Sequence, residues 1–250
     1  MIKLKTEEEI SLIKEAGKRL RKVVNRLKKE IKVGVTTNYI NEKAENLIRK
    51  YGGYPSFKTV KGYKWAICVP INEQIVHTPP SERILRKGDL LTIDIGLSYR
   101  GYHSDYAETI LIDDNNNSEK KRFLETGKDA LRRAINQVKI GNYIGDISRE
   151  IEKTITNSGF FIIKSLVGHG IGRKLHEDPL VPGFVSKKRE KTPLIKEGLA
   201  LAIEVIYSQR TENMIYEDKQ RWSIITADKS LSACFENTVI ATKKGPLIIV

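Results

Sequence analysis

The sequence has few of the features that mark secreted or membrane-spanning proteins. Only two of its 250 residues are cysteines, Cys68 and Cys234, and each lies within an apolar stretch far from the other. This spacing argues against a disulfide scaffold or a thiolate metal cluster. No apolar run approaches membrane-spanning length, and the first residues lack the apolar core of a secretory signal. We therefore predict reduced, buried cysteines, no membrane partner and a cytoplasmic location.

An ordinary balance of apolar and charged residues is combined with an excess of positive charge. Hydrophobic residues make up 40% and charged residues 30% of the chain, as is typical of soluble globular proteins. The 44 basic and 31 acidic residues give a formal net charge of +13, which favours polyanionic surroundings such as RNA or the ribosome. The lysines are scattered, without an aromatic-interleaved basic motif. A solvated basic surface is the simpler interpretation, and electrostatic docking to the ribosome is the functional one.

Helical and strand-like patterns alternate along the chain. A capping-box pair, Thr6 and Glu9, opens the first amphipathic stretch. Residues 54–112 and 159–250 have the composition of strands and turns. Four helices are predicted, from Thr6 to Gly34, from Thr37 to Gly52, from about Ser118 to near Gly141 and from Asp146 to about Ser158.

The order of two helices and then strands occurs twice, which indicates an internal duplication. The segment Arg86–Ile95 aligns with Lys196–Val205, glycine on glycine and apolar on apolar, so that Asp94 falls on Glu204. We expect these two carboxylates to meet near a pseudo-twofold axis, on the inner side of one curved sheet. The prediction is a single α+β catalytic domain, residues 1–250, with pseudo-repeats at about 1–112 and 113–250.

Asp94 and Asp105 flank a predicted hairpin turn at Ser98–Gly101. They are equidistant from a point between Tyr99 and Arg100, so a regular hairpin would place them directly opposite, with Cβ atoms about 5 Å apart. Two buried carboxylates that close repel each other unless they share a proton or a cation. A bound divalent metal would remove the conflict. The alternative is a different register in which both acids reach solvent, and the spacing alone does not choose between them.

Three further residues extend this candidate metal site. Glu204 and Glu236 each lie within an apolar strand-like segment, where burial requires a partner, and His169 lies between two glycines. Four carboxylates and one imidazole suit a pair of divalent ions (Co, Mn, Fe or Zn). Such ions would lie about 3.5 to 4 Å apart with a shared water. Glu204 could accept the proton of this water while it also serves as a ligand.

Five residues resemble, in order and spacing, the metal ligands of the methionine aminopeptidases: Asp94, Asp105, His169, Glu204 and Glu236. The segments Asn72–His77, Gly168–Pro179 and Trp222–Ser232 resemble active-site segments of the same family. The resemblance covers essentially the whole chain. The uninterrupted second half is similar to the type I branch of these enzymes, which belong to peptidase family M24 and have the pita-bread (creatinase/aminopeptidase-like) fold.

The resemblance implies a monomeric, dinuclear hydrolase that removes the initiator methionine from nascent polypeptides. It implies that Asp105 and Glu236 bridge two metals, and that Glu204, His77 and His176 take part in catalysis. His77 and His176 would contact the substrate, and His176 would stabilise charge on the carbonyl oxygen. Tyr63, Cys68 and Trp222 match positions around the methionine pocket. The chain departs from the usual family pattern at Thr78, Leu175, Val205 and Cys234.

Two other functions fit parts of this pattern. Aminopeptidase P and prolidase share the five ligands, so a proline-specific enzyme is the first alternative. Those enzymes carry an additional amino-terminal domain, whereas here the catalytic-type helices begin by Thr6, which favours methionine removal. A non-catalytic relative that binds the ribosome or RNA is the second, suggested by the charge of +13. Such a relative is expected to lack ligands, and all five are present.

Overall fold

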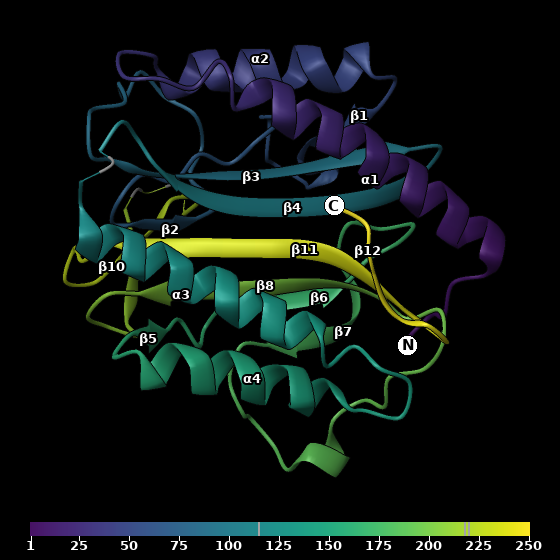
Figure 1. Ribbon diagram of the computed structural model, residues 1–250. Coiled ribbons are helices and arrows are strands. Elements are labelled where there is room, and N and C mark those ends of the chain that lie inside the picture. The colour runs from purple at the N-terminus through teal and green to yellow at the C-terminus, as the bar shows by residue number, and fades with distance from the viewer. Residues whose placement is uncertain (115, 218, 220) are drawn as a thin grey trace.

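A curved antiparallel sheet forms the centre of the molecule (Figure 1). The computed structural model describes residues 1–114, 116–217, 219 and 221–250. Among these, nine strands form the sheet, with β12 paired to β11 and β5 to β8 beside the main path. That path runs through β1 (Tyr54–Pro55), β3 (Leu90–Tyr99), β4 (Tyr102–Leu111), β11 (Ser232–Thr242), β8 (Ala200–Ser208), β6 (Val167–Gly170) and β7 (Glu177–Pro182), and the side strands are β5 (Phe161–Ile162) and β12 (Gly245–Ile248).

Four helices cover one face of this sheet. Figure 1 shows α1 and α2 beside β3 and β4, with α3 and α4 at the opposite end near β11 and β8. The odd-numbered residues of β3 pack under the first pair, and those of β8 pack under the second. Because side chains alternate along a strand, the even-numbered residues of β3 and β8 are left for the inner face. The helices are α1 (Glu7–Leu27), α2 (Thr37–Lys50), α3 (Ser118–Ile135) and α4 (Ile144–Asn157).

A smaller sheet of three strands contributes to the inner side. Its order is β2-β10-β9, from β2 (Gln74–Val76), β10 (Ile224–Thr226) and β9 (Met214–Tyr216). β2 contacts β11 and β8 of the large sheet, and the chain leaves β2 directly at His77. Short 3₁₀ helices occur at η1 (Ser56–Thr59) and η2 (Arg189–Lys191). Within the described ranges, none of the helices has both the length and the apolar character needed to cross a membrane.

The start of α1 agrees with the predicted capping box. The Thr6 hydroxyl accepts a hydrogen bond from the Glu9 amide, and the Glu9 carboxylate accepts one from the Thr6 amide. The predicted helix end at Gly34 is wrong. The helix ends at Leu27. The Lys28 amide still bonds to Val24, but the amides of Lys29 and Glu30 bond only three residues back, and Gly34 (φ 91°) donates its amide to the Leu85 carbonyl.

The third predicted helix is too long for the same reason. α3 ends at Ile135, and Gly141 (φ 92°) donates its amide to the Ile195 carbonyl, just as Gly34 does to Leu85. Apolar residues beyond each helix continue the helical spacing but lie in a connection made of turns. The same connection therefore follows the first helix of both halves, which supports the internal duplication; the duplication itself stays a prediction.

Candidate metal centre

The hairpin of β3 and β4 sets the position of the first two acidic residues. Its two-residue turn, Arg100 and Gly101, has positive φ at both positions (49° and 77°), the geometry of a type I′ turn. Asp94 consequently lies opposite Ala107, and Asp105 lies opposite Gly96. The predicted direct opposition of Asp94 and Asp105 is wrong, because the turn is centred one residue further along. The partner shifts by two positions, so both carboxylates still point to the same face.

The remaining ligand candidates follow from the register of the neighbouring strands. His169 on β6 pairs with Ala202, two residues before Glu204 on β8. Asp105 precedes Ala107 on β4 by the same interval. Since side chains two apart share a face, all five candidates belong to the inner face. Directly opposed residues form one row across β3, β4, β11 and β8: Asp94, Ala107, Glu236 and Glu204.

This row corrects the expectation that Asp94 and Glu204 meet. The two residues occupy equivalent strands, but β4 and β11 lie between β3 and β8. Any pseudo-twofold axis passes between the two central strands, so equivalent residues on the outer two strands face each other across the concave surface. Glu236 and Asp105, on the central strands, are the carboxylates nearest the middle.

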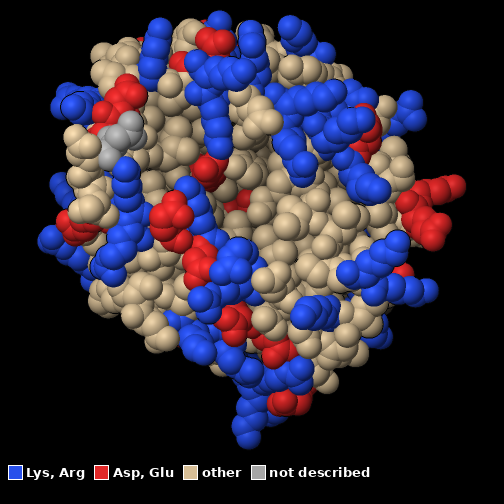
Figure 2. Space-filling model, in the orientation of Figure 1, with Lys and Arg blue, Asp and Glu red and all other residues tan. Residues whose placement is uncertain are grey.

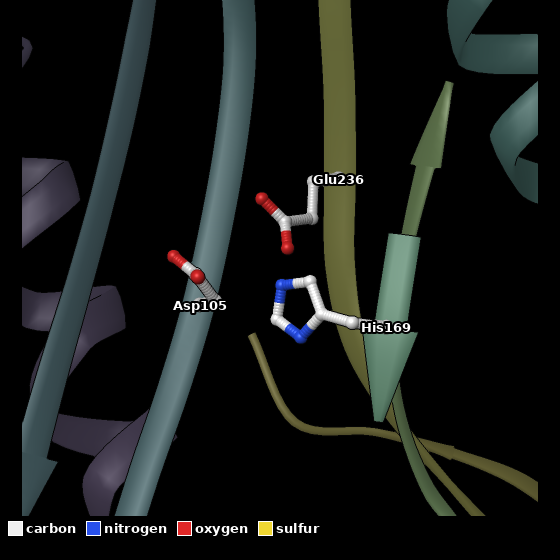
Figure 3. Close-up of side chains that lie close together, drawn as sticks. All are labelled: Asp105, His169 and Glu236. Atoms are coloured by element: carbon white, nitrogen blue, oxygen red, sulfur yellow. The ribbon is translucent and has the colours of Figure 1, made fainter. Parts of the chain in front are cut away.

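Three side chains lie close enough to share one ion. One ligand atom from each of Asp105, His169 and Glu236 lies within 4.8 Å of the others. Figure 3 shows these side chains side by side, from β4, β6 and β11. Glu204 is beside them, with its Oε1 3.4 Å from the Nε2 of His169. Asp94 lies at the other end of the row, next to the buried Cys68 thiol.

All ten residues that the sequence predicts for the site line one cavity of about 160 Å³. The metal-ligand candidates and two histidines line this cavity together with apolar side chains. Six of the apolar ones belong to one packed cluster: Phe57, Val60, Tyr63, Cys68, Leu175 and Trp222. Tyr63 and Trp222 are in edge-to-face contact, with ring centroids 5.1 Å apart. The lining residues are Phe57, Val60, Tyr63, Cys68, Val76, His77, Asp94, Asp105, His169, Leu175, His176, Glu204, Trp222, Cys234 and Glu236.

Comparison with known proteins identifies the family. The model of metallopeptidase family M24 matches residues 11–243. This chain belongs to family M24. It is 37% identical to a methionine aminopeptidase of Clostridium perfringens, an alignment that covers 100% of this chain and 98% of the relative. A methionine aminopeptidase of Bacillus subtilis is 36% identical over 98% of this chain and 97% of the relative.

Solved structures of the family have the same fold. The methionine aminopeptidase of Thermotoga maritima superposes with a TM-score of 0.95 at 32% identity, covering 100% of this chain and 99% of that one. A prolidase of Pyrococcus furiosus gives 0.78 at 25% identity, covering 98% of this chain and 64% of that one. The predicted α+β, pita-bread fold is therefore confirmed, as is membership of the family to which the methionine aminopeptidases belong.

The electrostatics of this M24 site are those of a cation site. Burial, together with repulsion between carboxylates, raises the pKa of Asp94, Glu204 and Glu236 well above the ordinary range. Burial raises the pKa of Asp105 to about 7. Among the described residues, the buried Oε1 of Glu236 has no hydrogen-bond partner. Because an unpaired buried carboxylate is costly, this set of oxygen and imidazole donors fits a divalent metal ion.

The imidazoles that face the cavity are neutral. Burial lowers the pKa of His77 and His169 to about 4 and also lowers the pKa of His176. The Nδ1 of His169 lies 2.8 Å from the carbonyl of Gly170, which can only accept. This bond places the proton on Nδ1 and leaves Nε2 free to act as a ligand. His77 has a φ of 57°, a left-handed conformation that is uncommon for residues other than glycine.

Two supporting residues were missed by the sequence analysis. The Thr238 hydroxyl accepts a bond from the Asp105 amide (2.8 Å) and donates one to the Asp105 carbonyl (2.9 Å). His103, buried two residues before Asp105, has its Nδ1 2.9 Å from the Ser56 hydroxyl. The signal was available, because each polar residue lies two positions from a ligand candidate on a strand and therefore shares its face.

We expect the metal-free protein to lose stability as the pH rises from 7 to 8. A carboxyl with a raised pKa keeps its proton when folded and releases it when unfolded, which costs about 1.4 kcal/mol per pH unit and per group. The four histidines have the opposite effect, because their lowered pKa values make unfolding bind protons, but only between about pH 4 and 6.5. Calorimetry in chelator at pH 7.0, 7.5 and 8.0 measures the slope.

Added Mn²⁺ or Co²⁺ should remove or reverse this slope, because the metal binds the deprotonated ligands. The isosteric variant Glu236→Gln, which has no proton to lose, should have a shallower slope in chelator. A metal-free protein whose unfolding temperature stays constant or rises between pH 7 and 8 would contradict the raised pKa values.

Proposed function

We propose that this chain is a methionyl aminopeptidase, a metal-dependent hydrolase that removes the N-terminal methionine from nascent polypeptides. One observation carries this proposal: the largely apolar side chains of Tyr63, Cys68 and Trp222 line the same cavity as the cluster of carboxylates and imidazoles. The unbranched, polarisable side chain of methionine suits such an irregular apolar pocket. The full-length similarity to methionine aminopeptidases supports the same conclusion.

Two divalent ions, drawn from Co, Mn, Fe and Zn, would be held in this site. The residues that would hold them are Asp94, Asp105, His169, Glu204 and Glu236. Bound ions would supply a water of lowered pKa and polarise the scissile carbonyl group. Carboxylate oxygens and one imidazole bind all four metals, so availability decides among them.

The side chains of the protein account for binding, orientation and proton transfer. The methionine side chain enters the apolar end, and Asp94 lies nearest the free amine. Glu204, whose carboxylate lies beside His169 in the cavity, takes the proton of the nucleophilic water and delivers it to the departing amine. His77 and His176, which line the cavity, contact the peptide, and His176 donates an N–H to the carbonyl oxygen as charge develops there.

We also propose a cytoplasmic monomer that meets nascent chains at the ribosome. On the face shown in Figure 2, Lys and Arg side chains are spread widely, with Asp and Glu between them. A dispersed positive charge supports weak, salt-sensitive attraction to polyanions. Co-sedimentation with ribosomes at increasing salt tests this docking separately from catalysis.

The activity is tested with the tripeptide Met-Ala-Ser under reducing conditions, with Mn, Fe or Co. We expect metal-dependent release of methionine and no release from Leu-Ala-Ser, because the apolar pocket would fit an unbranched side chain better than a branched one. An Ala-Pro peptide separates this activity from a proline-specific one. No methionine release with any of these metals, or cleavage of the Ala-Pro peptide alone, would overturn the proposal.

A further inference from the structure

The amino-terminal segment lies directly over the loop that carries His176. This His176 loop, residues 171–176, connects β6 to β7. The Lys5 ammonium is 2.6 Å from the carboxylate of Glu177, and the two side chains are only 5% and 11% exposed. Lysine and glutamate are seldom buried to this degree unless they are paired. Glu177 is the next residue after His176, so this buried ion pair is anchored one peptide bond from a residue that faces the cavity.

Lys5 is itself held in place by the backbone around it. Its amide donates to the carbonyl of Gly198 (2.8 Å), and its ammonium donates to the carbonyl of Lys3 (3.0 Å). A Cβ at Gly198 would lie 2.5 Å from the Lys5 carbonyl oxygen, so the two segments are in closest contact there. Gly198 precedes β8, the strand that bears Glu204. These contacts fix the position of the Lys5 ammonium relative to the large sheet, independently of its contacts with the loop.

The loop is shaped to receive the lysine. A Cβ at Gly172 would lie 2.4 Å from the Lys5 Cε and 2.8 Å from its Nζ, because the lysine crosses the loop at that point. The other oxygen of Glu177 accepts the Lys174 amide at 3.0 Å. Glu177 thus links the lysine to the loop backbone on the amino-terminal side of His176.

A second set of contacts joins the start of α1 to the same loop. Glu9 accepts a hydrogen bond from the Tyr102 hydroxyl (2.7 Å), and the guanidinium of Arg173 is 3.4 Å from the same oxygen. The side chains of Arg173 and Glu9 are more exposed than those of Lys5 and Glu177, and their ion pair is correspondingly weak. The pair of Lys5 and Glu177 is the buried member of the group.

We propose that Lys5 is a positioning residue for His176, acting through Glu177. The inference rests on the proposed function, in which His176 donates to the carbonyl oxygen of the substrate. The imidazole of His176 is also packed against His169, with ring centroids 4.5 Å apart. Displacing the start of β7 would therefore move His176 relative to the metal-ligand cluster. A donor misplaced by about 1 Å can lower the rate about 100-fold.

The first test removes the charge and keeps the length, with Lys5→Met. We expect kcat for Met-Ala-Ser to fall about 10- to 100-fold and KM to change by less than about threefold, because the lost interaction belongs to the transition state. In a His176→Ala background, the same substitution should change kcat by less than about twofold. An undiminished effect in that background would overturn the proposal. Lys14→Met, on the exposed face of α1, is the control for charge.

A second variant disturbs the ion pair of Lys5 and Glu177 by a change in the loop. Gly172→Ala displaces the lysine while leaving both charges in place, and should reproduce the fall in kcat if Lys5→Met does not fold. Wild-type kcat in folded Gly172→Ala would overturn the inference.

A measurement independent of activity separates the two proposals. The chain has four histidines, so their ring signals can be assigned by NMR in the metal-free protein. We expect Lys5→Met to shift or broaden the His176 signal and to leave His77 nearly unchanged. An unchanged His176 signal would overturn the role of Lys5 even in an active enzyme. A wild-type protein that releases no methionine would instead overturn the proposed function.

Discussion

Replacing Asp105 with alanine should reduce metal-dependent methionine release at least about 1000-fold, more than the 10- to 100-fold typical of residues that only support a ligand. Asp105 belongs to the group of three side chains with ligand atoms within 4.8 Å, and it is buried on a central strand. Its removal takes an oxygen donor from the middle of the cluster. Release of methionine from Met-Ala-Ser, measured with saturating Mn²⁺, gives the ratio to wild type.

Glu108→Ala is the matched control, because Glu108 lies on the same strand and points to the opposite face, where it pairs with Lys28 beside α1. It also changes one carboxylate to a methyl group. We expect activity within about threefold of wild type, since Glu108 and Lys28 lie on the face of the sheet away from the ligand candidates. Substantial activity in Asp105→Ala, or equal losses in both variants, would argue against a specific ligand role for Asp105.

Replacing His176 with alanine should lower kcat by about 100- to 1000-fold, the usual cost of losing one donor to a developing oxyanion. KM should change far less, because the methionine side chain still binds in the apolar end of the cavity. The neutral ring that we infer from its lowered pKa can donate one N–H without carrying a charge. Steady-state kinetics on Met-Ala-Ser separate the two parameters.

His176→Gln retains an N–H donor of similar reach and should recover part of the lost kcat. The amount of bound metal, measured in both variants, should equal that of wild type, because His176 is not among the ligand candidates. A large rise in KM with unchanged kcat would mean that His176 only binds the substrate, and the proposed role would be wrong.

Local sequence patterns were sufficient where a local rule decides the structure. The capping pair of Thr6 and Glu9 starts α1 as predicted, because an N-cap is made within four residues. The same kind of reasoning failed at the helix end. Ile31 continues the apolar spacing, yet the chain turns after Leu27 to reach a hydrogen bond between Gly34 and the distant Leu85.

The hairpin that carries Asp94 and Asp105 also shows what local patterns can and cannot predict. The sequence predicted a turn near Gly101, but the turn centre can lie at either of two positions one residue apart. The choice between them changes which residue lies opposite each acid. The type I′ turn matches the twist of the strands and selects the register in which Asp94 lies opposite Ala107. The alternation of side chains made the shared face predictable even though the pairing was not.

By itself, the sequence determined which residues could form the metal centre: four acids within apolar strands, and one histidine between glycines, are chemically costly to bury without a cation. It also determined the order of helices and strands. Only the tertiary structure decided which of these residues meet. The register across β4, β11, β8 and β6 brings Asp105, His169 and Glu236 together, and the amino-terminal segment brings Lys5 against the His176 loop. Such contacts join residues more than 60 positions apart, and no local spacing encodes them, because they depend on how the sheet curves and which segments its edges expose.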